Sequence, residues 1–330
     1  MPAQSTVSPQ ADGSVPGDAG TDGSGDLGGE ETSAPPGAQP LPEPPDRLSL
    51  PTLMAQDFVA GPLQRTRLVL DAGAYRRYEA IYRSGRVTVS GILIVPRGKG
   101  PFPGVVLNHG YIDPAIYVTG QGLAREQDAL ARAGFVVFHT DYRGHASSDP
   151  VPEADRETRL GYTRDTINAV LALRQEPRVD PERIAMLGRS MGGGVTYNAL
   201  VAAPGLVRAA VVYAPVSSRF KDNLRQFVIP SRPESAARLY ARHGTPRQSP
   251  EFYAGLSPRT YFEQITEPVL IHHGTSDDTC PLRWSRATYR LMRAAGVDVR
   301  LRIYPGEQHA FVPQWEQSMR RTIAFLRRNM

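Results

Sequence analysis

Two patterns of hydrophobic and polar positions follow one another along the chain. Between residues 65 and 96, apolar and polar residues alternate in three stretches, TRLVLD, YRRYEAIYR and VTVSGILIVP. This period of two predicts three half-buried strands that are joined by short turns in antiparallel order. Beyond residue 100, continuously apolar strand cores alternate with amphipathic stretches of helical length. That second pattern predicts βαβ crossovers and a parallel sheet that is covered on both faces.

The second pattern defines most of the predicted elements. Six apolar runs predict strands: PGVVLNHG, GFVVFHTDYRG, RIAMLGRS, AAVVYAPV, PVLIHHG and VRLRIYPG. Helices are predicted near 121–133, 155–175, 191–203, 282–295 and 314–328. We therefore expect an α/β fold with a mostly parallel central sheet of about eight strands and helices on both faces. Residues 217–266 contain no strand pattern, and an insertion of this length predicts a helical lid.

The first 50 residues differ from the rest of the chain in composition. They consist mainly of Gly, Pro, Ala, Ser, Asp and Glu and contain almost no large apolar side chain. Such a segment cannot bury enough surface to offset its loss of conformational entropy, which predicts a disordered acidic tail at 1–50 and a folded domain at 51–330. The segment lacks the basic start and apolar core of a signal peptide. The single cysteine, Cys280, fits a reducing compartment, so we expect a cytoplasmic protein. An exported protein whose signal peptide is absent from this chain is the alternative.

The charge and hydropathy of the chain bear on whether it binds nucleic acid or spans a membrane. The chain carries a formal net charge of +5, and its first 50 residues carry −7, so the remainder carries +12. The arginines are dispersed over every predicted element without a basic block, and we therefore expect no nucleic-acid partner. The longest apolar runs, such as AAVVYAPV, are too short to span a membrane. The sequence gives no indication of the oligomeric state.

One serine lies among glycines where a buried strand is predicted to end. Ser190 is flanked by Gly188 and Gly192 in GRSMG, which satisfies the pattern G-x-S-x-G. Glycines without a Cβ allow the strand and the following helix to pass closely, so that the serine projects from a sharp turn. In parallel sheets, functional sites form at the carboxyl ends of the strands. Ser190 is therefore the candidate nucleophile.

A serine hydroxyl needs a base to accept its proton, and the base is usually a histidine that a carboxylate orients. His309 follows the last predicted strand, in a loop that can reach back over the sheet, and it is the candidate base. Asp277 and Asp278 follow the strand PVLIHHG, and either can supply the carboxylate. The chain order Ser, Asp, His is the order of α/β-hydrolases. The other histidines lie in predicted strands, beside strand ends or in the insertion, at 109, 139, 145, 243, 272 and 273.

The same reaction needs two hydrogen-bond donors for the oxyanion. The backbone N–H of Met191, next to the nucleophile, is one candidate. The backbone N–H of Tyr111, in the loop after VVLNHG, is the other, and the hydroxyl of Tyr111 is an alternative donor. No H-E-x-x-H motif is present, and the adjacent His272 and His273 point to opposite faces of a strand, so we expect neither a metal nor another cofactor.

These motifs resemble those of the α/β-hydrolase superfamily, and within it the catalytic domain of the prolyl oligopeptidase family of serine peptidases. The resemblance spans roughly residues 65 to 330 and depends on NHGY, DYRGH, GRSMGGG, HHGTSDDTCP and YPGEQHAF. The family's H-G-x-x-D element implies that Asp277 is the triad acid. Its G-x-S-x-G element and its C-terminal histidine loop imply Ser190 and His309 as the other two members.

The resemblance implies a serine hydrolase that acts through an acyl-enzyme on small peptides or amides. A carboxylesterase for small acyl esters is the alternative, because the triad serves both substrates and the chain has no room for the β-propeller that family peptidases typically carry. Arginines of the insertion, such as Arg232, are candidates to pair with a substrate carboxylate. A non-catalytic binding module on this fold usually lacks a triad member, whereas this sequence contains all three.

Overall fold

The computed structural model of the protein describes residues 47–330, except for the side chains of residues 153–155. The acidic tail predicted at 1–50 therefore lies almost entirely outside the described residues. The folded unit begins before residue 51, because Ser49 caps the first helix, α1 (Leu50–Met54), by accepting a hydrogen bond from the N–H of Thr52 at 3.2 Å. Leu50 and Leu53 of this short helix are buried.

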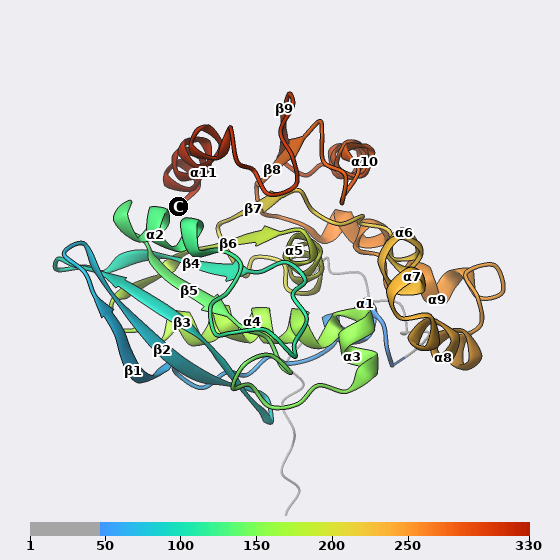
Figure 1. Ribbon diagram of the computed structural model, residues 1–330, viewed down its shortest axis with the longest axis horizontal. Helices are drawn as coiled ribbons and strands as arrows, with labels where there is room; N and C mark the ends of the chain where they lie inside the picture. Colours follow the sequence, from blue (N-terminus) through green and yellow to red (C-terminus); the bar gives the residue numbers. More distant parts are fainter. Residues whose placement is uncertain (1–46) are drawn as a thin grey trace, which may run out of the picture. The chain divides into compact units, whose positions relative to one another are not determined.

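Within the described residues 47–330, a mixed sheet of nine strands organises the fold (Figure 1), one strand more than the eight or so expected. Its order is β1-β2-β3-β5-β4-β6-β7-β8-β9. The first three strands form the antiparallel meander that the alternating pattern predicts, β3 pairs antiparallel with β5, and all later pairs are parallel. The strands are β1 (Gln64–Asp71), β2 (Tyr75–Ser84), β3 (Val87–Pro96), β4 (Phe102–Asn108), β5 (Val136–Thr140), β6 (Val179–Arg189), β7 (Ala209–Tyr213), β8 (Val269–Gly274) and β9 (Val299–Tyr304).

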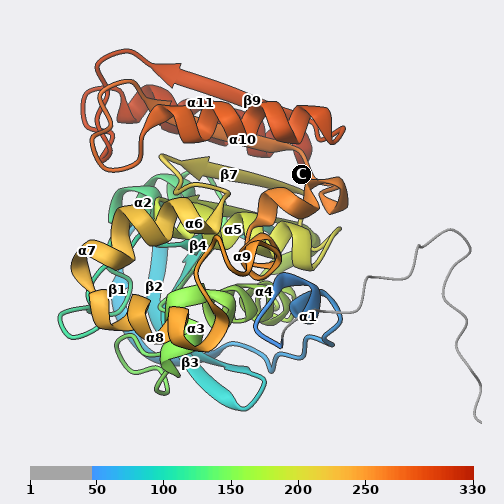
Figure 2. The ribbon, with the colours of Figure 1, turned by 90° about the vertical axis from the view of Figure 1, so that its right-hand side faces the viewer.

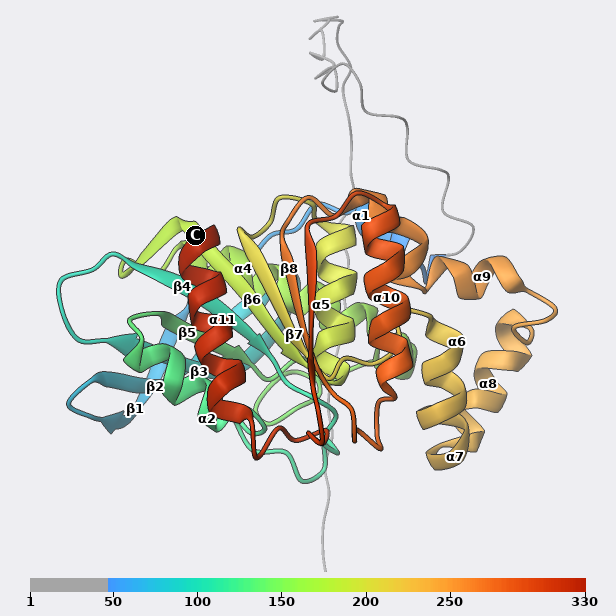
Figure 3. The ribbon, with the colours of Figure 1, turned by 90° about the horizontal axis from the view of Figure 1, so that it is seen from above.

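Helices cover both faces of this sheet, as Figure 3 shows. One face carries α2 (Ala124–Arg132) and α11 (Trp315–Asn329). The other face carries α4 (Leu160–Arg174), α5 (Met191–Ala202) and α10 (Leu282–Ala294). All five helices lie within a few residues of the ranges that the sequence predicts. Because strands β4 to β9 are parallel, the loops that lead from their carboxyl ends into the helices lie at one edge of the sheet. A catalytic site is expected at this edge.

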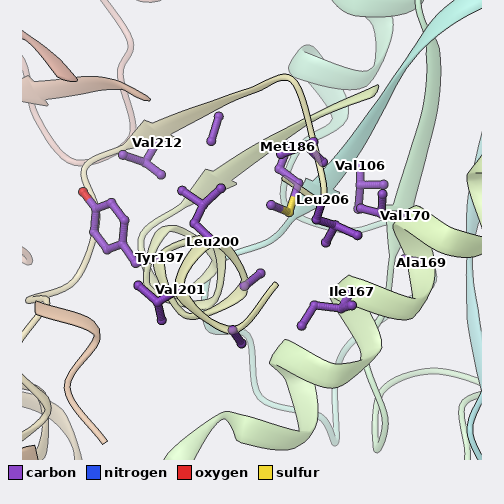
Figure 4. Packing of buried hydrophobic residues seen from close by; sticks show 14 of the residues in the cluster. Val106, Ile167, Ala169, Val170, Met186, Tyr197, Leu200, Val201, Leu206 and Val212 are labelled. Atoms are coloured by element: carbon purple, nitrogen blue, oxygen red, sulfur yellow. The ribbon is translucent and has the colours of Figure 1, made fainter. Parts of the chain in front are cut away.

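Each face of the sheet has its own hydrophobic core. Alternate residues of β6 divide between the two, with Met186 on the side of α4 and α5 and Leu187 on the opposite side. Figure 4 shows Met186 and Val106 of the sheet packed among the side chains of Val170, from α4, and Leu200, from α5. Both faces of each central strand are excluded from water, which explains why the sequences of these strands are apolar without alternation.

The insertion between β7 and β8 is helical, as its lack of a strand pattern predicts. Figures 1 and 2 show α8 (Pro233–His243) beside α3 (Glu153–Thr158), the short helix that follows β5. Arg232, at the start of α8, donates hydrogen bonds to the Glu157 carboxylate of α3 at 3.0 and 3.2 Å. The insertion contains α6 (Phe220–Asn223), the π-helix η1 (Leu224–Val228), α7 (Ile229–Ser231), α8 (Pro233–His243), α9 (Pro250–Gly255) and the 3₁₀ helix η2 (Pro258–Gln264).

Within residues 47–330, no helix combines the length and the hydropathy that crossing a membrane requires.

Candidate active site

Ser190 occupies a strained turn between β6 and α5, with φ 54° and ψ −117°. A positive φ is unusual for a residue with a Cβ and is found at sites where the surrounding structure holds it in place. The two glycines of the motif provide that constraint. A Cβ at Gly192 would lie 1.9 Å from the carbonyl oxygen of Asn108, and one at Gly188 would lie 2.3 Å from the carbonyl oxygen of Gly192. No larger residue fits at either position without movement of the backbone.

Asp277 and His309 are hydrogen-bonded, although they lie 32 positions apart in the sequence. The Nδ1 atom of His309 lies 3.0 and 2.9 Å from the two oxygens of the Asp277 carboxylate. A carboxylate only accepts hydrogen bonds, so Nδ1 carries the proton of the neutral ring and Nε2 keeps a free lone pair. The Asp277 side chain is fully buried, whereas that of His309 is 22% exposed. The imidazole can therefore accept a proton at Nε2 from a neighbouring hydroxyl group.

The environment of Asp277 holds it in the ionised form. Burial would raise the pKa of this carboxyl, but hydrogen bonds from His273 and His309 and from the Cys280 N–H outweigh burial and lower the pKa well below its usual range. His273 Nε2 lies 3.2 Å from the carboxylate, and the N–H groups of Thr279 and Cys280 donate to Oδ1 at 3.0 and 2.8 Å. The Asp277 carboxylate therefore stays ionised at neutral and mildly acidic pH.

Ser190 lies close to both loops that follow β4 and β8. Its Oγ is 4.0 Å from the Sγ of Cys280, and Cys280 also donates its N–H to Asp277. In the described part of the chain, Ser190 Oγ and the His309 ring make no hydrogen bond with each other. Their loops are nevertheless directly connected, because Arg189 donates a hydrogen bond to the carbonyl oxygen of His309 at 3.3 Å. The structure thus brings the three predicted residues to one edge of the sheet.

The two predicted oxyanion donors also lie beside Ser190. Met191 is the first residue of α5, so its backbone N–H has no acceptor within the helix. The loop that carries Tyr111 passes the nucleophile closely, because a Cβ at Gly110 would lie 3.3 Å from the Cβ of Ser190. Tyr111 is 52% exposed, and the guanidinium of Arg232 lies over its ring at 5.4 Å. This loop and the first turn of α5 therefore border the same space.

Sequence reasoning missed a buried ion pair that joins the nucleophile turn to the histidine loop. The Arg189 guanidinium pairs with the carboxylate of Glu126, which is 2% exposed, and also donates to the carbonyl oxygens of His309 and Ala310. Trp315 donates its indole N–H to the same carboxylate at 3.1 Å. The second position of G-x-S-x-G is variable in the motif, so the sequence carries no signal for this pairing.

Glu307 is a second residue that the sequence did not reveal. Its side chain is fully buried and accepts the backbone N–H groups of Gln308, Val312 and Gln314 at 3.0, 2.9 and 2.6 Å. These bonds fold the loop that carries His309 around a single carboxylate. A buried charge is stable only when such partners surround it. Glu307 therefore holds the His309 loop in place from within the protein interior.

Replacement of Arg189 by methionine is expected to destabilise the protein by about 3–5 kcal/mol, because the Glu126 carboxylate would remain buried without its cation. Thermal unfolding measures the loss. The double variant R189M/E126M, which leaves no buried charge, should recover much of it. Arg125→Met is the matched control, since Arg125 is exposed and donates to the neighbouring carbonyls of Ala310 and Phe311. Equal unfolding temperatures for wild type and R189M would contradict the prediction.

Residues 47–330 contain no group of three or more His, Cys, Asp or Glu side chains arranged to hold a metal ion. The two ring nitrogens of the buried His272 form hydrogen bonds with the hydroxyl groups of Tyr304 and Thr322, at 2.7 and 3.1 Å. His273 lies on the opposite side of β8, where Ser285 and the carbonyl of Cys280 bond its two ring nitrogens. These two histidines serve the core and the Asp277 loop respectively.

The sheet order, the strained serine turn and the helices on both faces define an α/β-hydrolase, and the chemistry is that of a serine hydrolase. Residues 122–330 match the sequence profile of the prolyl oligopeptidase family, and the chain belongs to that family. The family and fold that the sequence motifs imply are thereby confirmed.

Individual relatives differ in how much of their length this chain covers. The chain is 26% identical over 244 residues to YtmA of Bacillus subtilis, an uncharacterized peptidase, and the match covers 72% of this chain and 88% of YtmA. It is 27% identical over 219 residues to the acylamino-acid-releasing enzyme of Rattus norvegicus. That match covers 65% of this chain but only 29% of the enzyme. Among solved structures, acetyl xylan esterase 1 from a Thermoanaerobacterium species aligns with a TM-score of 0.64 at 19% identity, over 84% of this chain and 92% of that one. This last likeness shows the fold alone.

Proposed function

We propose that the protein is a serine peptidase for short peptides or amides and that Ser190, Asp277 and His309 are its catalytic triad. The observation that carries the proposal is the 2.9 Å contact between the Asp277 carboxylate and His309 Nδ1, beside a serine in a strained turn. The carboxylate orients the imidazole and stabilises the imidazolium that forms when the ring accepts a proton.

In the proposed reaction, Ser190 Oγ attacks the substrate carbonyl carbon while His309 Nε2 accepts the hydroxyl proton. The imidazolium then donates this proton to the leaving amine, and an acyl-enzyme remains on Ser190. Water, deprotonated by the same imidazole, attacks the acyl carbon and releases the acid with regeneration of the serine hydroxyl. The proposal requires Oγ and Nε2 to come within hydrogen-bond range when substrate binds, and such bonds are often long before substrate binds.

The negative oxygen of the tetrahedral intermediate would lie between the N–H of Met191 and the N–H of Tyr111. The first N–H belongs to the initial turn of α5, where the helix dipole also favours negative charge. Gly110 supports the second assignment because its close approach to Ser190 brings the loop toward the same carbonyl. Backbone donors of this kind need no reorganisation during the reaction.

The family and the names of relatives support a peptidase. YtmA is named a peptidase, and the rat relative is named for the release of acylated amino acids. The alternative is a carboxylesterase for small acyl esters, because an acyl-enzyme is common to both substrates and one similar solved structure, of which this chain covers 92%, is an esterase.

We expect the purified protein to release 4-nitroaniline from short N-acyl and aminoacyl anilides as well as 4-nitrophenol from 4-nitrophenyl acetate. Activated esters react with most acyl-enzyme formers, whereas anilide cleavage also requires protonation of an amine leaving group. Absorbance at the two product wavelengths measures both rates on one preparation. Turnover of the ester without any turnover of the anilides would favour the carboxylesterase instead.

A further inference from the structure

Arg159 differs from the other cations around the candidate active site. It lies between α3 and α4 in a left-handed backbone conformation, with φ 63° and ψ 11°. Its carbonyl oxygen accepts hydrogen bonds from both the N–H and the hydroxyl of Thr163, at 2.9 Å each, so the backbone is held independently of the side chain. Glycine would adopt this conformation without strain. A long cationic side chain at such a position points to a role for the side chain itself.

The Arg159 side chain reaches toward the first turn of α5. A Cβ at Gly194 would lie 3.9 Å from an Nη atom of Arg159, and the N–H of Gly194 donates to the carbonyl oxygen of Ser190 at 3.3 Å. The charge of Arg159 also acts on Cys280. The pKa of that thiol is raised to about 12 mainly by burial and by Asp277, and the positive charge of Arg159 opposes the rise. Because Gly194 is bonded to the Ser190 carbonyl, its contact with the guanidinium places Arg159 next to the first turn after the nucleophile.

This guanidinium is partly buried, yet no described side chain pairs with it. Glu157 is the described carboxylate that acts on Arg159, but its side chain is 5% exposed and accepts two hydrogen bonds from Arg232 instead. The trio of Arg159, Arg232 and Glu157 thus carries a surplus of one positive charge. Burial lowers the pKa of Arg159 from its ordinary value, but an arginine remains charged in proteins. A cation withdrawn from water without a fixed anion favours an anion supplied by a ligand.

We propose that Arg159, with Arg232 beside it, binds a carboxylate of the substrate next to the scissile carbonyl. The planar guanidinium can donate two parallel hydrogen bonds to a carboxylate. Arg232 already contacts Tyr111, with a 3.5 Å hydrogen bond to the phenol oxygen, so the positive surface continues toward the predicted oxyanion loop. This proposal deepens the proposed function and rests on it. The carboxylate belongs either to the acyl group or to the leaving group of the substrate.

Two pairs of matched esters distinguish these sources. On the acyl side, 4-nitrophenyl hydrogen glutarate is compared with 4-nitrophenyl pentanoate, which has the same chain length without the charge. On the leaving-group side, 4-acetoxybenzoate is compared with its methyl ester. Rates in the presence of the Ser190→Ala protein are subtracted, because charged esters also hydrolyse without an enzyme. Arg159→Met retains the side-chain length, and Arg159→Lys retains the charge but loses the planar fork.

Arg159→Met is expected to lower kcat/KM for the charged member of one pair by about 10- to 100-fold, the effect of losing one charge-assisted interaction. The neutral member of that pair should change by less than about threefold, and Arg159→Lys should fall between wild type and Arg159→Met. Arg225→Met is the control, because Arg225 is an exposed arginine of η1 and its loss changes the net charge equally. It should leave both rates nearly unchanged.

Equal losses for charged and neutral esters in both Arg159 variants would overturn the carboxylate proposal and leave the proposed function intact. The proposed function would fail separately if wild-type protein hydrolysed none of the four esters and if a fluorophosphonate did not label Ser190. Preference of the wild type for the neutral member of both pairs would also overturn the proposal, even if Arg159→Met proved too unstable to measure.

Discussion

Replacement of Ser190 by alanine is expected to lower kcat/KM by a factor on the order of 10⁴ or more for every substrate that the protein hydrolyses. Alanine removes the only atom that forms the acyl-enzyme and leaves the strained backbone with a residue of similar size. Oxyanion donors and substrate binding would remain, so a small residual rate is expected. Initial rates on 4-nitrophenyl acetate measure the loss, and a fluorophosphonate probe followed by mass spectrometry of the peptides locates the reactive serine.

Cys280 is the control for this experiment, because its thiol is a potential nucleophile that lies 4.0 Å from Ser190 Oγ. Burial and the charge of Asp277 raise its pKa to about 12, so the thiol is protonated near neutral pH and unreactive. The Cys280→Ala protein should therefore still be labelled at Ser190. Labelling that persists in Ser190→Ala at any other residue would contradict the assignment of the nucleophile.

Much of the fold followed from the sequence because its pattern is local and consistent. The period-two alternation of β1 to β3 and the uninterrupted apolar runs of the later strands each reflect how many faces of a strand are buried. The glycine pattern around Ser190 was equally informative. Gly188 and Gly192 are required by backbone atoms that lie within 2.3 Å of any added Cβ, so the motif reports a geometric constraint directly. Short elements such as α3 and η1 carry too few residues for a period to be seen.

Other parts of the site could not be predicted because they depend on contacts between distant positions. Glu126 and Arg189 are 63 residues apart, and nothing in either local sequence indicates that they pair. The left-handed conformation of Arg159 is likewise hidden, because most non-glycine residues avoid it and no turn motif marks it. Their positions in the sequence also could not show which of the adjacent Asp277 and Asp278 is the acid of the triad. The structure separates them, since the Asp277 carboxylate is buried against two histidines whereas Asp278 is exposed and contacts Thr279.

Because the Asp277 carboxylate is buried against His309, its replacement should strongly reduce the rate of catalysis. Asp277→Asn is expected to lower kcat by roughly 10³- to 10⁴-fold, as loss of the orienting carboxylate does in a Ser-His-Asp triad. The N–H groups of Thr279 and Cys280 donate to Oδ1, so the amide oxygen of an asparagine would stay at that position. Its NH₂ group would then face Nδ1 of His309 and Nε2 of His273, at the place of Oδ2. The His309 proton would move to Nε2, which could no longer accept a proton from Ser190.

Asp278→Asn is the matched control, because it makes the same chemical change one residue away on an exposed side chain. It should alter kcat by less than about threefold, in the range of an exposed charge that is largely screened by water. Steady-state rates for both variants on one ester, with circular dichroism to verify folding, make the comparison. If kcat fell more in Asp278→Asn than in Asp277→Asn, the triad acid would be Asp278. That result would contradict the assignment based on the contacts of Asp277 with His309 and His273.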